Sequence, residues 1–170
     1  MKQQQIVKLF PEIKLIKKAE LRDGVIKAWL NAVDKGGWRS INDLPFTLLV
    51  DTGKTLIEHT RIVTRMAYAI ATERSDLNID IVLAGALVHD VGKLLEYTRK
   101  GKQIVKSDYG KMVRHPVSGY GICLEVGLPL PVAHIVAAHS VEGDKVKRSK
   151  EAVVINHCDF IDFDIEKNKK

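Results

Sequence analysis

The sequence predicts an all-α fold, a helical bundle with a metal centre between its helices. Apolar residues recur at spacings of three and four along several segments, which is the period of helices packed on a core. His89 and Asp90 stand side by side within one apolar segment, and neighbouring residues diverge by about 100° on a helix. Both side chains can reach one ion only where other helices supply further ligands.

The first third of the chain is expected to hold short helices followed by a loop. Residues 11–33 favour two helical pieces that separate at Arg22-Asp23-Gly24, and Pro11 suits a first helical turn. Gly36-Gly37 and Pro45 then mark a loop.

A longer helix is predicted from about residue 51 to Glu73. Asp51 or Thr52 would cap it, because short polar side chains accept hydrogen bonds from the free amides of a first turn. Its inward stripe is expected to consist of five residues at helical spacing, namely Leu56, His59, Val63, Met66 and Ile70. His59 therefore points toward the core.

A second buried helix is predicted from about Ile79 to Tyr97, and it carries the His89-Asp90 pair. Small residues at positions 84–86 would let a neighbouring helix approach closely. Residues 98–111 lack a helical period and favour a polar loop or a short hairpin that flanks a substrate. Further helices are expected over residues 117–126, 131–139 and 150–163.

The chain length and apolar content predict a single domain over residues 1–170, with a helical extension (residues 1–50) and a core (residues 51–165). Its 27 basic and 21 acidic residues give a formal net charge of +6, which favours an anionic partner such as a nucleotide or RNA. A charge run is more often a solvated surface than a binding site.

Cysteine usage and hydropathy narrow the expected location. Cys123 and Cys158 lack metal-type spacing, so we expect buried reduced thiols and a cytoplasmic protein. The apolar stretches are interrupted well short of about 18 residues, so neither a membrane partner nor export is expected.

Four further metal-capable residues surround the pair in sequence, namely His59, His115, His139 and Asp159. Their spacing places each on or beside a different helix, which is how a bundle builds a metal centre in its interior. A lone histidine in an apolar stretch is more often satisfied by the backbone, but the whole set favours metal binding. His134 and His157 fall outside the pattern, and we expect a structural role for the first and an outward direction for the second.

These residues follow the order H, HD, D and resemble the HD superfamily of metal-dependent phosphohydrolases. The run His-Asp-Val-Gly-Lys (residues 89–93) is similar to the His-Asp-Ile-Gly-Lys variant shared by the HD-GYP phosphodiesterases and the HD domain of ribonuclease Y. Ser140 stands where the ribonuclease Y subgroup usually has a second histidine. No Gly-Tyr-Pro signature follows His139, so hydrolysis of cyclic dinucleotides is the weaker expectation. Three further segments look most like ribonuclease Y, residues 115–121, 135–139 and 151–159.

The resemblance implies one ion held by His59, His89, Asp90 and Asp159. A second ion would share Asp90 as a bridge and use His115 and His139, so one or two ions of Fe, Mn, Ni, Co or Zn are expected.

Asp90 and Lys93 are the implied catalytic residues. Lys93 would contact a nonbridging phosphate oxygen, the alternative being a lysine at the protein surface. Gly92 would keep the helix open to substrate or mark a local break. Arg114 and Lys111 are weaker candidates for binding the substrate phosphate.

The implied activity is that of a metal-dependent phosphohydrolase or phosphodiesterase that acts on a nucleotide or short oligonucleotide through a metal-activated hydroxide. Two alternatives stay open, a non-catalytic HD module that binds a nucleotide or a protein partner, and an RNA-processing nuclease. Nothing in the sequence resembles a KH-type Gly-x-x-Gly loop or an RNP aromatic motif, so a phosphorylated small molecule is favoured over long RNA.

Overall fold

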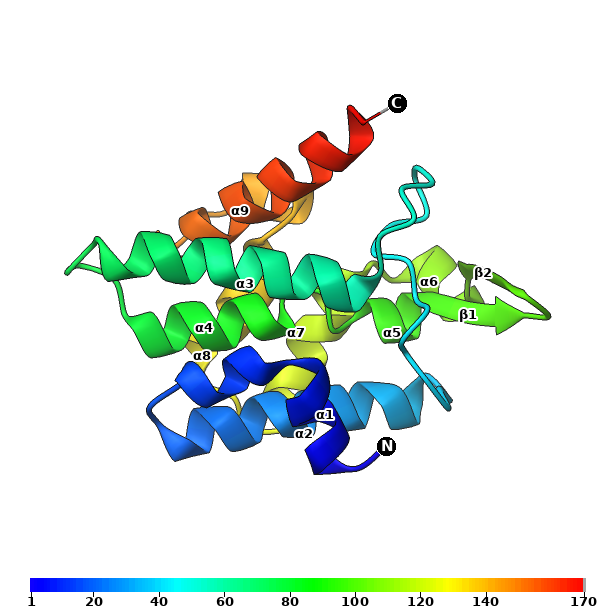
Figure 1. The fold of residues 1–170 in the computed structure, drawn as a ribbon, viewed down its shortest axis with the longest axis horizontal. Coiled ribbons are helices and arrows are strands. Elements are labelled where there is room, and N and C mark those ends of the chain that lie inside the picture. The colour runs from blue at the N-terminus through cyan, green and yellow to red at the C-terminus, as the bar shows by residue number, and fades with distance from the viewer. Residues whose placement is uncertain (170) are drawn as a thin grey trace.

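A computed structural model describes residues 1–169 and confirms the all-α prediction (Figure 1). The centre of the bundle is α4 (Ile79–Val88), which packs against α2 (Ala19–Lys35), α3 (Leu56–Thr72), α8 (Leu130–Ala138) and α9 (Lys150–Lys167). Because α4 is surrounded by other helices, nearly all of its residues are buried, and a helix buried on all sides is apolar all round. None of the described helices is both long and apolar enough to cross a membrane.

The N-terminal segment comprises α1 (Gln3–Leu9), a 3-10 turn (Pro11–Leu15) and α2. The predicted break at residues 22–24 is wrong, since α2 runs through Gly24 without interruption. Gly24 serves packing, because a Cβ there would lie 2.6 Å from Cδ2 of Leu128. Burial of one face of α2 outweighs the low helix propensity of glycine.

The cap of α3 is Thr55, and neither Asp51 nor Thr52 has this role. The Thr55 side chain accepts from the amide of Glu58, whose carboxylate accepts from the Thr55 amide at 2.8 Å. The helix therefore begins with a capping box. Residues 46–54 form a loop before it, closed at its base by an antiparallel bridge between Pro45 and Thr55.

The predicted inward stripe of α3 is confirmed at the N-terminal end of the helix, where Leu56, His59 and Val63 are fully buried. At the other end Ile70 is 38% exposed, and Ala67 and Ala71 are buried in its place. The predicted spacing drifts off the buried face because α3 packs chiefly on α4 and α9.

The helix predicted over residues 79–97 is divided. The chain leaves α4 at Val88, turns through residues 89–92, and forms the short helix α5 (Lys93–Glu96). Gly92 sits in this turn against the start of α7 (His115–Glu125), where a Cβ would overlap the carbonyl oxygen of His115. Gly92 therefore marks a local break, the second of its two predicted roles, and permits a close backbone contact there.

Trp29 in α2 and Trp38 just after α2 donate hydrogen bonds to the helices on either side of this turn. Trp29 Nε1 donates to the carbonyl of Leu87 at 2.9 Å, and Trp38 Nε1 donates to the carbonyl of Leu94 at 2.6 Å. The last carbonyls of a helix lack intrahelical donors, and the indoles satisfy two of these carbonyls, one near the end of α4 and one in α5.

The predicted hairpin exists as β1 (Tyr97–Lys100) and β2 (Gln103–Lys106), with Tyr97 opposite Lys106. The rest of the predicted polar loop forms a short helix, α6 (Asp108–Met112). The last three predicted helices correspond to α7, α8 and α9, and a 3-10 turn (Val141–Lys145) lies between α8 and α9. Cys123 and Cys158 are buried free thiols.

The N-terminal helices share one hydrophobic core with α4, α7 and α8, while a smaller cluster lies between α3, α4, α8 and α9. The division into an extension (residues 1–50) and a core (residues 51–165) stays a prediction.

Candidate metal centre

The six predicted ligand residues converge from separate elements at the centre of the bundle. His59 lies on α3, Asp159 lies on α9, and the His89-Asp90 pair occupies the turn after α4. The remaining two residues lie at helix ends, His115 at the start of α7 and His139 directly after α8. Five of the six are buried, and the Asp159 side chain is 17% exposed.

One half of the centre lies around Oδ2 of Asp90. His59 Nε2 is 3.0 Å from Asp159 Oδ1, 3.3 Å from His89 Nε2 and 3.4 Å from Asp90 Oδ2. His89 Nε2 is also 3.4 Å from the same oxygen of Asp90. These distances place four ligand atoms around one small volume.

The other half lies around Oδ1 of Asp90. This oxygen is 3.3 Å from His115 Nε2 and 3.6 Å from His139 Nε2. One carboxylate therefore presents a different oxygen to each group of histidines, which is the arrangement of a bridging ligand.

In each of the four histidines of the centre, Nδ1 points away from Asp90 and makes a hydrogen bond of 2.7 Å. His89 and His139 use the backbone carbonyls of Ala86 and Val136, each three residues earlier at the end of a helix. A carbonyl only accepts, so Nδ1 carries the proton in both rings and Nε2 keeps a lone pair that points inward.

The other two histidines use carboxylates that the sequence analysis did not identify. His59 Nδ1 donates to Asp162 Oδ2 and His115 Nδ1 donates to Glu96 Oε2, both at 2.7 Å. Each acid lies three residues after a predicted site residue, Asp159 or Lys93, so an acidic residue at helical spacing was the available signal.

Burial and hydrogen bonding shift the pKa of His115, and likewise that of Glu96, in opposite directions. Burial lowers the pKa of His115 to about 4, although the hydrogen bond that its Nδ1 donates to Glu96 opposes this. Burial would raise the pKa of Glu96, but the contacts with His115 lower it to about 2. The pair is therefore a neutral imidazole and a carboxylate, the states that metal binding requires.

The residues present fit a divalent metal. Asp90 Oδ1 and His139 Nε2 are buried without a hydrogen-bond partner, which is costly for polar atoms in an interior. Within the described chain, ligand atoms of His59, His89 and Asp159 lie within 4.8 Å of one another, and so do those of His89, Asp90 and His139. Nitrogen and oxygen donors without thiolates suit Fe, Mn, Co, Ni or Zn.

Lys93 is buried, with 7% exposure, so it is not a lysine of the protein surface. Its Nζ donates to Asp90 Oδ2 at 2.6 Å and to the carbonyl oxygen of Phe46 at 2.5 Å. Burial would raise the pKa of Asp90, but the charge of Lys93 and the contacts with His89 and His139 hold it well below its usual range. Burial would likewise lower the pKa of Lys93, and the charge of Asp90 raises it. The two groups form a buried ion pair.

A cavity of about 260 Å³ opens beside the centre, and its lining includes Asp90, Lys93, His115 and Asp159. Arg114 and Lys106 provide basic groups in its lining, whereas Lys111 does not line it and pairs with Asp108 at 2.7 Å. The apolar lining comprises Phe46, Leu48, Leu49, Val141, Phe160 and Phe163. No local sequence pattern indicated this wall, because its members come from a loop, a 3-10 turn and α9.

Phe46 also contacts the centre directly. Its ring stacks on His59 with centroids 4.6 Å apart and an interplanar angle of 25°. The two remaining histidines behave as expected, since His134 accepts a hydrogen bond from the Ser149 amide at 3.1 Å and His157 is exposed.

This fold and site define the class of protein. Residues 56–164, more than half of the chain, match the family model of the HD domain, and the chain belongs to that family. It is similar to the dihydroneopterin 2',3'-cyclic phosphate phosphodiesterase of Methanocaldococcus jannaschii, at 29% identity over 116 residues. The alignment covers 65% of this chain and 47% of the relative, so the chain spans about half of that protein's length. Comparison with solved structures gives no match.

Proposed function

We propose that the protein hydrolyses a phosphoester of a small nucleotide-like molecule with the help of one or two divalent metal ions. The observation that carries this proposal is the placement of Asp90, which lines a cavity and whose two oxygens face separate histidine groups. Membership of the HD family and the similarity to a phosphodiesterase support hydrolysis of phosphoesters in general.

In this proposal His59, His89, Asp90 and Asp159 hold one ion, and Asp90, His115 and His139 hold the second. When bound, such ions lower the pKa of a coordinated water and neutralise charge on phosphoryl oxygens. The two cysteines offer no competing nucleophile, because burial raises the pKa of Cys123 to about 12 and that of Cys158 to about 11.

The chain's own cations would bind the phosphoryl group. Lys93 lines the cavity beside Asp90, and Arg114 lines the same cavity. A fixed ammonium in a site that excludes water stabilises charge that develops on phosphoryl oxygens. Each cation already has a carboxylate partner, Asp90 for Lys93 at 2.6 Å and Glu142 for Arg114 at 3.1 Å, and Lys93 is favoured because its partner belongs to the candidate metal centre.

The cavity favours an organic phosphoester with a planar ring. Phe46, Phe160 and Phe163 offer aromatic surface on which a planar ring could pack, and the basic groups serve a phosphate. Pockets for drug-sized ligands usually enclose about 300 to 1,000 Å³, so the volume of about 260 Å³ suits one small molecule rather than long RNA. By its name, the relative from M. jannaschii acts on a small ring-bearing cyclic phosphate. The likeness to ribonuclease Y stays a prediction.

The test is a hydrolysis panel with protein purified without oxygen and supplied with Mn, Fe, Co or Ni. The substrates are 2',3'-cyclic mononucleotides, 5'-mononucleotides, dinucleotides and a short RNA, and Asp90→Asn serves as the inactive control. Metal-dependent release of product from a mononucleotide supports the proposal. Nucleotide binding without turnover would favour a non-catalytic module, and cleavage confined to RNA would favour a nuclease.

A further inference from the structure

The carboxylates that hold His59 and His115 belong to different halves of the centre. Asp162 holds His59, whose Nε2 faces Oδ2 of Asp90, and Glu96 holds His115, whose Nε2 faces Oδ1. His89 and His139 need no such side chain, because each uses a carbonyl of the helix that it ends. Each half therefore contains one histidine whose orientation depends on a distant acidic side chain.

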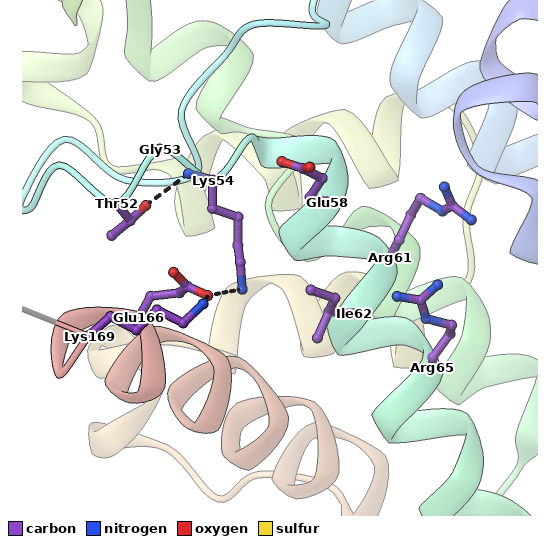
Figure 2. A pocket seen from close by; sticks show the side chains of 9 residues that line it. All are labelled: Thr52, Gly53, Lys54, Glu58, Arg61, Ile62, Arg65, Glu166 and Lys169. Atoms are coloured by element: carbon purple, nitrogen blue, oxygen red, sulfur yellow. Dashed lines mark hydrogen bonds and ion pairs between the residues drawn. The ribbon is translucent and has the colours of Figure 1, made fainter.

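Asp162 is itself held by the loop that precedes α3. Lys54 Nζ donates to Asp162 Oδ1 at 2.7 Å and pairs with Glu166 Oε1 at 2.7 Å. Figure 2 shows the Lys54 side chain extending from this loop to Glu166 on α9. Little of any of the three side chains is exposed, so these ion pairs are only weakly screened by solvent. Lys54 thereby fixes Asp162 as an acceptor aimed at His59.

Glu96 is fixed in a different way. Its Oε2 accepts from the backbone amide of His115 at 2.8 Å as well as from the ring, so backbone and imidazole are bound to one oxygen. Lys106 Nζ lies 3.5 Å from the other oxygen. The start of α7 and the ring of its first residue are therefore positioned together.

A carboxylate that accepts a hydrogen bond from Nδ1–H fixes the ring and makes Nε2 a stronger metal ligand. Loss of such a partner typically lowers metal affinity 10- to 100-fold. We propose that Asp162 and Glu96 are positioning residues for separate metal ions, Asp162 with Lys54 for the ion at His59 and Glu96 for the ion at His115. The inference rests on the metal sites of the proposed function but does not require turnover.

The test compares metal titrations of Asp162→Asn, Glu96→Gln and the unaltered protein. Metal affinity is measured with Co²⁺ against a chromophoric chelator, and metal content by mass spectrometry. Asparagine offers one oxygen where His59 and Lys54 both need an acceptor, so Asp162→Asn should weaken one ion roughly tenfold or more. Glu96→Gln should weaken the other ion by a similar factor. The His115→Ala variant identifies which ion belongs to which half.

Glu166→Gln is the matched control. It removes the next carboxylate of the same ion-pair group, yet leaves the hydrogen bond between Asp162 and His59 in place. It should lower the melting temperature about as much as Asp162→Asn while both metal affinities stay unchanged. Asp162→Glu, which restores a carboxylate, should recover part of the affinity.

Several outcomes would overturn the inference. One is equal weakening of both ions by each variant, and another is an effect of Asp162→Asn no larger than that of Glu166→Gln. A protein that binds one ion overturns the role of Glu96, and a protein that binds none overturns the whole inference. Separate effects on two ions in a protein that hydrolyses no phosphoester would support the inference while contradicting the proposed function.

Discussion

Lys93 donates its ammonium to Oδ2 of Asp90 at 2.6 Å, so the carboxylate that faces both histidine groups also belongs to a buried ion pair. The two residues were predicted on one continuous helix, but they lie in a turn and at the start of the next short helix. Loss of either partner therefore affects stability as well as chemistry.

Asp90→Asn should abolish metal retention and hydrolysis. It should also lower the free energy of unfolding by about 3 to 5 kcal/mol, because Lys93 is left buried without its counter-ion. Urea unfolding and metal analysis measure the two effects. The double variant Asp90→Asn/Lys93→Met removes the orphaned charge and should recover much of the stability without regaining metal. Metal content equal to that of the unaltered protein would rule out Asp90 as a bridging ligand.

Lys93→Ala should lower turnover roughly a hundredfold, about 2.7 kcal/mol of transition-state stabilisation. The melting temperature should also fall, because Asp90 and the carbonyl of Phe46 lose their donor. Lys93→Arg keeps the charge and should recover part of both properties. Kinetics with saturating metal separate the two effects. Undiminished turnover in Lys93→Ala would mean that another group, with Arg114 the first to test, binds the phosphate.

Metal analysis should find two ions per chain in the unaltered protein and one in His115→Ala or His139→Ala. Both histidines lie within 3.6 Å of Oδ1 of Asp90, while the group around Oδ2 stays intact in these variants. Saturation of the unaltered protein at one ion, with activity present, would instead describe an enzyme with a single metal.

Gly92→Ala should destabilise the protein by about 1 to 3 kcal/mol, the usual range for overpacking. Its Cβ would overlap the carbonyl oxygen of His115 and lie 2.7 Å from the Gly119 amide nitrogen, both of them backbone atoms. The control is Gly121→Ala in α7, where nothing lies within 4 Å of the added Cβ. This variant should be neutral or stabilising. Urea unfolding of both variants gives the comparison, and equal midpoints would contradict it.

The helical fold could be predicted from local spacing, and the set of six polar residues from its spacing together with the resemblance to the HD superfamily. The helical period placed His59 inward on α3, whereas Asp159 on α9 entered the predicted set through the resemblance to the HD superfamily. Metal binding by these residues stays a prediction. The hydrogen-bond partners of the histidine rings could not be found in this way, since Asp162 and His59 are 103 positions apart in the sequence.

The errors have the same cause. Gly24 favours a break by propensity, yet it lies on the buried face of α2, where Leu128 leaves no room for a Cβ, and burial of that face outweighs the propensity. Gly92 is compatible with a continuous helix by periodicity, yet its contact with the start of α7 accompanies a turn there. Tertiary packing decided both cases, and no local window of sequence contains it.

The chain has two tryptophans, and their indole groups donate to the carbonyls of Leu87 and Leu94, on either side of the turn that carries His89 and Asp90. Indole fluorescence responds to changes in hydrogen bonding and local polarity. The natural emission of the protein is therefore an intrinsic optical reporter of this turn. Opening of the turn can be followed by fluorescence without a label, and a shift that precedes global unfolding would identify it as a separately melting element.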